Sequence, residues 1–231
     1  MSDTEADTPL SQSSPSTEMA PVVRKRPKPG ERRLQILQTL ATMLEQPGAE
    51  RITTAALAAR LGVSEAALYR HFASKAQMFE GLIEFIEHSV FSLVNQIVDR
   101  AQAVGVPDAL GQRTSDDATG TRQAANVVLM LIQFAEKNPG MTRVMVGDAL
   151  VFENERLQQR MNQFFDKIEA TFRQSLRVDL DVAGSPTPTV DAQVRASVVT
   201  AFVVGRLQRF ARSGFKRLPS EHLDASLRLI L

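Results

Sequence analysis

One short stretch of the chain predicts a helix with hydrogen-bonding and cationic side chains on its outer surface. Residues 64–75 read SEAALYRHFASK, in which Leu68 and Phe72, four residues apart, supply the buried face. A helix with small side chains in its first turn and hydrogen-bond donors along its outer side can enter the DNA major groove and approach base edges. The outward residues of this predicted reader helix are Glu65, Ala66, Tyr69, Arg70 and His71.

The preceding residues predict a second helix and the turn that must position the first. Apolar residues recur at helical spacing in AALAARL, residues 55–61. Gly62 supplies the backbone freedom of a tight turn, and Ser64 is a natural N-cap for the helix that follows. Thr53 and Thr54 stand where the supporting helix begins, so their hydroxyls can cap it or contact phosphate.

A third cap lies just beyond the reader helix. Ser74 followed by Lys75 places a cation beside a helix N-terminus, which is a common way to hold a phosphate. Two amphipathic helices joined at a glycine are also compatible with a plain helical hairpin. The paired threonines, the exposed positions of Tyr69 and His71, and this capped cation favour a DNA-reading domain.

The composition excludes several classes of site. The chain has 231 residues, 43% of them hydrophobic, and no cysteine, so disulfides, thiolate nucleophiles and zinc ribbons are ruled out. The three histidines, His71, His88 and His222, lack ligand spacing, and no glycine-rich phosphate loop appears. We therefore expect no enzyme activity, no metal and no cofactor.

No apolar run reaches the roughly 20 residues of a membrane span and no signal peptide is evident, which predicts a cytoplasmic protein.

Charge is segregated along the chain, although the net charge is only +1. Residues 1–23 contain acids and no base, and RKRPKPGERR follows immediately at residues 24–33. Residues 1–30 are rich in Ser, Thr and Pro, which predicts a disordered arm with a basic end. That end either follows the phosphate backbone or is a solvated linker, and the sequence leaves both interpretations open.

The hydrophobic periodicity predicts an all-α protein, because no segment alternates as a strand would. We expect a three-helix helix-turn-helix domain over residues 31–77, followed by a larger helical bundle over residues 78–231. The predicted helices span about 31–46, the reader pair, 74–103, 124–136, 141–180 with a break near Gly147 or Phe152, 191–212 and 220–230.

The helix at 191–212 is the best candidate for a dimer interface. A single reader helix contacts few bases, so such domains commonly pair about a two-fold axis. Ala196, Ala201 and Gly205 are small enough to allow close helix approach, although the same apolar face can also be monomer core. The apolar positions of this helix are Val194, Val198, Ala201, Phe202, Gly205 and Phe210, and the expected interface is Val198, Ala201, Phe202 and Gly205.

Two long motifs carry a family resemblance. The first is ITTAALAARLGVSEAALYRHFASKAQMFEGLIEFIE and the second is EKNPGMTRVMVGDALVFENERLQQRMNQFFDKIEA. From about residue 31 to residue 216 the chain resembles the TetR family of bacterial regulators and, within it, the nucleoid occlusion factors. The resemblance implies a TetR-like fold in which the C-terminal bundle is used for dimerisation.

The resemblance also implies partners and roles. It implies a nucleoid-associated homodimer that binds palindromic double-stranded DNA and, when DNA-bound, antagonises polymers of the division protein FtsZ. Thr53 and Thr54 would serve the start of the supporting helix. Base edges would be approached by Ser64, Glu65, Ala66 and Ala67, and phosphates held by Tyr69, Arg70, His71 and Lys75.

A partner surface is expected on the helix after the reader. On a helical wheel, Met78 and Phe85 lie off the axis of the apolar stripe that runs from Phe79 to Ile97. A Phe off this stripe is either the edge of a wide core face or a contact for another molecule. In similar proteins the C-terminal tail of the division partner docks between this helix and the one before Asn138. The resemblance therefore points to Phe85, Lys137 and Asn138.

One rival function keeps the same fold. A ligand-responsive TetR-type repressor would release DNA when a small molecule entered the bundle, with polar residues such as Gln133 lining its pocket.

Overall fold

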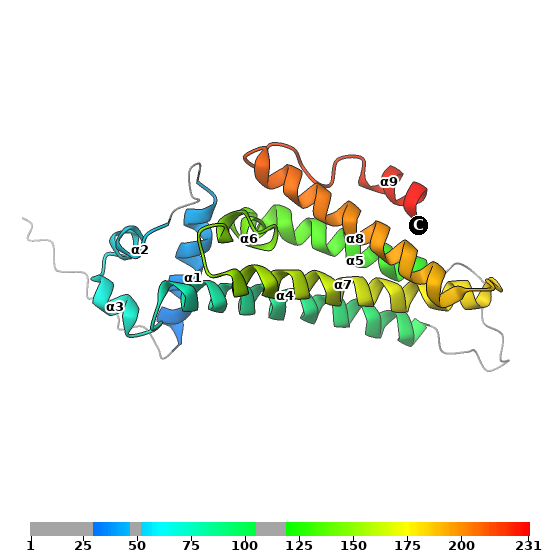
Figure 1. Cartoon of the computed structure of the whole chain (residues 1–231), viewed down its shortest axis with the longest axis horizontal. Coiled ribbons are helices and arrows are strands. Elements are labelled where there is room, and N and C mark those ends of the chain that lie inside the picture. The colour runs from blue at the N-terminus through cyan, green and yellow to red at the C-terminus, as the bar shows by residue number, and fades with distance from the viewer. Residues whose placement is uncertain (1–29, 47–51, 105–118) are drawn as a thin grey trace, which may run out of the picture.

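The computed structural model describes residues 30–46, 52–104 and 119–231, and all its regular elements are helical. The predicted all-α fold is confirmed (Figure 1). Apart from Gly30, the predicted arm at residues 1–30 lies outside the described residues. The helices are α1 (Glu31–Leu44), α2 (Thr54–Leu61), α3 (Glu65–Tyr69), α4 (Lys75–Val104), α5 (Thr119–Lys137), α6 (Pro139–Met145), η2 (Asp148–Leu150), α7 (Glu155–Val182), α8 (Pro188–Arg212) and α9 (Leu223–Ile230).

Helices α1, α2 and α3 form a small unit at one end of the molecule (Figure 1). The turn between α2 and α3 is the predicted one, because Gly62 ends α2 in the left-handed conformation with φ of 65°. Both apolar residues expected on the inner side of the reader, Leu68 and Phe72, are 1% exposed. They share one core with Leu40 and Leu57, so the burial of these side chains fixes how α3 is presented.

The four long helices α4, α5, α7 and α8 make up the bundle (Figure 1). The predicted apolar stripe of α4 is buried from Phe79 to Val94, and Ile97 is partly buried. Phe164 of α7 is fully buried and meets the ring of Phe91 edge-on at 5.4 Å. These contacts hold α4 firmly along α7.

A close helix crossing joins the reader unit to the bundle. Gly140 of α6 packs so tightly on α1 that a Cβ built on it would lie 1.9 Å from the carbonyl oxygen of Ala41. Helix α4 also runs without a break across residue 77, so it belongs to both parts. The proposed division into residues 31–77 and 78–231 stays a prediction.

The sequence misplaced some details of the C-terminal half. Ala196, named among the small residues that would allow close helix approach, is fully buried and belongs to the monomer core; Phe210, named only as an apolar position, is 2% exposed, which fits the alternative that this face is core. Helix α9 begins at Leu223 rather than near residue 220. The break expected near Gly147 or Phe152 is confirmed, since Gly147 has φ of 83° and α7 begins only at Glu155.

Candidate nucleic-acid interface

Three hydroxyl caps hold the ends of the helices around the reader, as the sequence predicted. The Thr53 hydroxyl accepts a hydrogen bond from the Ala56 amide at 3.1 Å at the start of α2. Ser64 accepts one from Ala67 at 3.3 Å at the start of α3. The Ser74 hydroxyl accepts from the Gln77 amide at 3.2 Å before α4. Each bond satisfies an amide that the helix leaves unpaired.

The reader helix itself is short, and its surface is open. Helix α3 has five residues and ends at Tyr69, and Arg70 and His71 lie in the turn that follows it. Arg33 fixes this turn by donating to the His71 carbonyl oxygen at 3.1 Å and by stacking over the Phe72 ring at 4.2 Å. Ala67 is half-buried, and the exposed residues are Ser64, Glu65, Ala66, Tyr69, Arg70 and His71.

A hydrogen-bonded chain links α2 to α3 on this surface. The Thr54 hydroxyl donates to Glu65 Oε2 at 2.6 Å, and the Tyr69 hydroxyl donates to Thr54 Oγ1 at 3.4 Å. The single hydroxyl proton of Thr54 is thus directed to a carboxylate. By contrast, the Thr53 hydroxyl accepts the cap bond and donates to none of the residues that the structure describes, so its proton is available for a phosphate oxygen.

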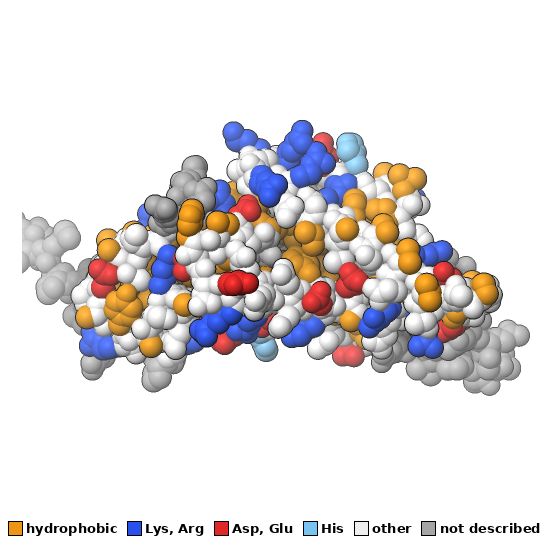
Figure 2. Space-filling view, viewed as in Figure 1, with side chains coloured by type: hydrophobic (Ala, Val, Ile, Leu, Met, Phe, Trp, Pro, Cys, Tyr) orange, Lys and Arg blue, Asp and Glu red, His pale blue; other side chains and the backbone are white. Residues whose placement is uncertain are grey.

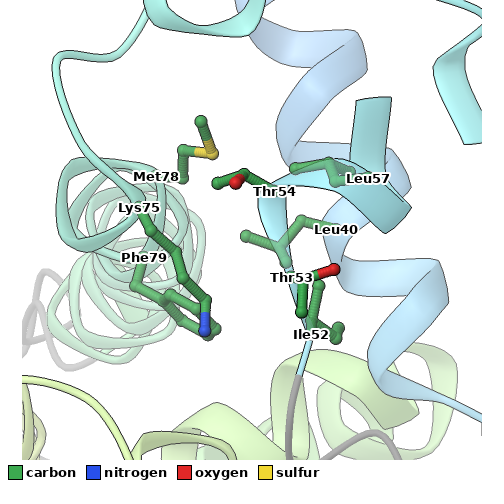
Figure 3. Close-up of a pocket in the computed structure, with 8 residues that line it drawn as sticks. All are labelled: Leu40, Ile52, Thr53, Thr54, Leu57, Lys75, Met78 and Phe79. Atoms are coloured by element: carbon green, nitrogen blue, oxygen red, sulfur yellow. The ribbon is translucent and has the colours of Figure 1, made fainter. Parts of the chain in front are cut away.

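The two cations expected at phosphates differ in their surroundings. Arg70 is exposed and has no ion pair with any residue that the structure describes. Lys75 instead lies beside Glu153, with Nζ 2.5 Å from Oε1, and its side chain is 32% exposed against 9% for Glu153. The ammonium also lies 5.7 Å from the centre of the Phe79 ring (Figure 3).

Two arginines of α7 form ion pairs with glutamates of α4. Arg156 pairs with Glu80, and Arg160 donates to Glu87 Oε2 at 2.6 Å. The hydrogen bond to Glu87 raises the pKa of Arg160, with the nearby charges of Glu87 and Glu84 adding to the effect against the opposing cost of burial. These ion pairs attach the length of α4 nearest the reader to α7.

The residues named for the partner surface, and Met78 beside them, differ in how far they are exposed. Phe85 is 37% exposed on α4, as a contact residue requires, but Met78 is 1% exposed and is core. Met78 is covered because it shares one core with Leu40 of α1, Leu57 of α2 and Ile52 just before α2, which line the same crevice (Figure 3). Lys137 is exposed at the end of α5. The Asn138 amide donates to the Phe134 carbonyl oxygen at 2.8 Å, so it also holds the end of α5.

The face of α8 expected to form a dimer is open. Val198 is 51% exposed, Ala201 is exposed, and Phe202 and Gly205 are half-buried. A Cβ built on Gly205 would meet nothing within 4 Å, so the space beside it is open to another helix. Val194, also on this helix, is 59% exposed. Figure 2 shows Lys and Arg side chains along the upper edge, where α8 ends and leads towards α9.

Sequence reasoning missed two residues that support this interface, and the pocket residue of the rival function is not enclosed. Glu153 and Arg33 act through contacts with residues 78 and 38 positions away, and no local pattern signals such contacts. Gln133, named as a possible pocket residue, is exposed. The crevice between the first two helices and the start of α4 (Figure 3) encloses no space of the size that a small-molecule pocket needs.

Within the described residues, no helix is long and apolar enough to cross a membrane. In the same part of the chain, no group of three His, Cys, Asp or Glu side chains is placed to hold a metal ion.

Solved structures share the fold at low sequence identity. The transcriptional regulator FadR from Bacillus subtilis superposes with a TM-score of 0.64 at 13% identity, covering 85% of this chain and 96% of that one. A TetR-family transcriptional regulator from Rhodococcus sp. gives 0.60 at 21% identity, covering 87% of this chain and 99% of that one. These likenesses establish a TetR-like architecture.

Sequence comparison is more specific. Residues 36–82 match the model of bacterial regulatory proteins of the tetR family, and residues 119–231 match the SlmA-like, tetracyclin repressor-like C-terminal domain. A protein named nucleoid occlusion factor SlmA from Aliivibrio fischeri is 47% identical over 199 residues, covering 86% of this chain and 93% of its own length. SlmA of Vibrio cholerae is 50% identical over 194 residues, covering 84% and 90%. The chain belongs to the SlmA group of the TetR family.

Proposed function

We propose that this chain is a nucleoid occlusion factor: a homodimer that binds palindromic DNA and, in its DNA-bound form, antagonises assembly of the FtsZ ring over the chromosome. The observation that carries the proposal is the 45–50% identity, over more than four-fifths of the chain, to relatives named nucleoid occlusion factor SlmA. No catalytic step is part of this function.

The DNA-binding part of the proposal is supported by the reader surface. The Ser64 cap, the small Ala66 and the exposed Tyr69, Arg70 and His71 give a surface with no bulky apolar side chain at its tip. Thr53 and Arg70 are the best placed to contact phosphate, because neither is engaged by an acidic side chain among the described residues.

The dimer is supported by the open face of α8. Valine side chains that are half exposed or more, next to a glycine with free space, are costly to leave in water and allow two helices to approach closely. A second copy paired through this face would place two readers on one DNA molecule, as a palindrome requires.

The FtsZ contact is assigned to the exposed side of α4. Phe85 offers the apolar part of this contact, and Lys137 offers a cation at the end of the neighbouring α5. The side chain of Asn138 partly stabilises α5, so we expect its share of the contact to be smaller.

Sedimentation of FtsZ polymers tests the function directly. FtsZ with GTP is pelleted alone, with the protein, and with the protein bound to its operator duplex. The proposal predicts less pelleted FtsZ with the DNA-bound protein than with the DNA-free protein. Equal pelleting in all three conditions would contradict the proposed antagonism, and the duplex alone serves as the control for DNA effects on FtsZ.

The observations favour this function over the ligand-responsive repressor. Gln133, the polar residue expected in such a ligand pocket, is exposed, and the crevice beside the reader encloses no space for a small molecule. A metabolite that releases the protein from DNA would reverse this preference.

A further inference from the structure

One acidic side chain stands on the surface that the proposed function brings against DNA. Glu65 is the first residue of α3 and is exposed. A carboxylate is repelled by the phosphate backbone, so its presence on a reader surface weakens binding unless a donor in the groove meets it. An acid in the first turn also stabilises a helix, but that role does not require the carboxylate to be held in one orientation.

The structure holds this carboxylate in place from α2. The Thr54 hydroxyl donates to Glu65 Oε2 at 2.6 Å, and Thr54 Oγ1 is itself the acceptor for the Tyr69 hydroxyl at 3.4 Å. Oxygen Oε2 is therefore engaged, while no described side chain donates to Oε1. An acceptor restrained on one side and open on the other loses little conformational freedom when a ligand donates to it.

Only some bases present a donor in the major groove. Guanine offers the acceptors N7 and O6, and thymine offers O4 and a methyl group. Adenine offers the N6 amino group beside the acceptor N7, which repels a carboxylate. Cytosine offers the N4 amino group and, unlike adenine, has no acceptor of its own on the major-groove edge. A fixed carboxylate oxygen therefore matches cytosine best.

We propose that Glu65 reads a cytosine amino group in each half-site of the operator, and that Thr54 is the residue that positions its carboxylate. The inference rests on the proposed function, since it requires the chain to bind specific DNA. Thr54, expected to cap the supporting helix or to contact phosphate, is in this proposal the residue that supports base reading.

In vitro selection from a random duplex pool tests the proposal with the full-length protein. Wild type should select a palindrome with one invariant cytosine in each half-site. A glutamine can donate and accept, and it pairs with adenine N6 and N7; Glu65→Gln should therefore move the preference at this position from cytosine to adenine. Asp224→Asn, which removes a first-turn acid from α9, is the matched charge control and should select the wild-type palindrome.

Titrations of the selected duplex measure the size of the effect. Changing the cytosine to thymine should weaken wild-type binding on the order of tenfold. In Glu65→Gln the ratio of the affinities for the cytosine and thymine duplexes should fall to about one. Thr54→Val keeps the shape of the side chain but removes the hydroxyl, so it should retain the cytosine preference with a smaller ratio. Thermal unfolding that matches the wild type establishes that the fold of each variant is intact.

The outcomes separate this inference from the proposed function. If Glu65→Gln selects the same cytosine with an undiminished ratio, Glu65 does not read that base. If Thr54→Val discriminates as well as wild type, Thr54 does not position the carboxylate. If wild type selects no sequence at all, specific DNA binding itself fails and the inference fails with it.

Discussion

Lys75 Nζ lies 2.5 Å from Glu153 Oε1, an ion pair that joins the first residue of α4 to the turn before α7, 78 residues further along the chain. The same ammonium is the sequence's candidate for a phosphate contact. Glu153 is nearly buried, so its attraction to Lys75 is less screened than that of a surface pair. A DNA phosphate must therefore compete with Glu153 for this cation.

This competition predicts that Glu153→Gln tightens DNA binding. The amide keeps a hydrogen-bond acceptor but removes the charge, so Lys75 is released toward phosphate, and we expect a few-fold gain in affinity. Fluorescence anisotropy with a labelled operator measures it. The same change made in a Lys75→Ala background should give no gain. An equal gain in both backgrounds would show a general charge effect and refute the competition.

Arg70→Ala should weaken binding because it removes a cation from a DNA phosphate. The slope of log affinity against log salt concentration is negative, and removing one such cation makes it shallower by about 0.9. A dimer without both arginines should therefore lose affinity less steeply as salt rises. Titrations at several salt concentrations measure the slope. Arg228→Ala, an exposed change on α9, is the control. A slope equal to that of wild type rules out Arg70 as a phosphate-binding residue.

Phe85→Ala should separate the two activities. Phe85 is partly exposed on α4 and distant in sequence from the reader, so the DNA affinity should stay within about twofold of wild type. The DNA-bound variant should no longer reduce the amount of FtsZ that pellets. Val182→Ala, at an exposed valine ending α7, is the control. Loss of DNA binding together with FtsZ antagonism would mean that Phe85 is a structural residue.

Ala201→Arg should convert the dimer into a folded monomer. The side chain points to open solvent in one copy, so the monomer tolerates it, whereas a partner helix would meet a buried charge. Light scattering after size exclusion gives the mass, and circular dichroism gives the helix content. Gln174→Arg on the exposed side of α7 is the control. A dimer that persists in Ala201→Arg would place the interface elsewhere.

Gly140→Ala should lower the melting temperature. Its new Cβ would overlap the Ala41 carbonyl oxygen, so α6 and α1 must move apart at a cost of about 1–3 kcal/mol. Thermal unfolding followed by circular dichroism measures the change. An unchanged melting temperature would mean that the crossing of α1 and α6 is loosely packed.

Local features of the reader were predictable from sequence because their causes are local. The caps at Thr53, Ser64 and Ser74 each use an amide three residues ahead, and Gly62 adopts the left-handed conformation that its turn requires. The apolar stripe of α4 follows from helical spacing alone. These interactions depend on few neighbours, so residue type and spacing are sufficient to place them.

Features that depend on other helices were not predictable. A helical wheel puts Met78 and Phe85 at similar distances from the core axis, but α1 and α2 cover only Met78. Ala196 and Ala201 are equally small, yet only Ala196 is buried. The acceptor for the Thr54 hydroxyl lies on α3, and the partner of Lys75 lies beyond the whole of α5. Packing decides these cases.

Crosslinking at native expression, followed by mapping of the chromosomal binding sites, tests nucleoid occlusion by this protein. A nucleoid occlusion factor must occupy much of the chromosome, so we expect many palindromic sites that are dispersed along it and depleted near the replication terminus. One or two sites beside a transporter or enzyme gene would contradict nucleoid occlusion and would instead favour the ligand-responsive repressor.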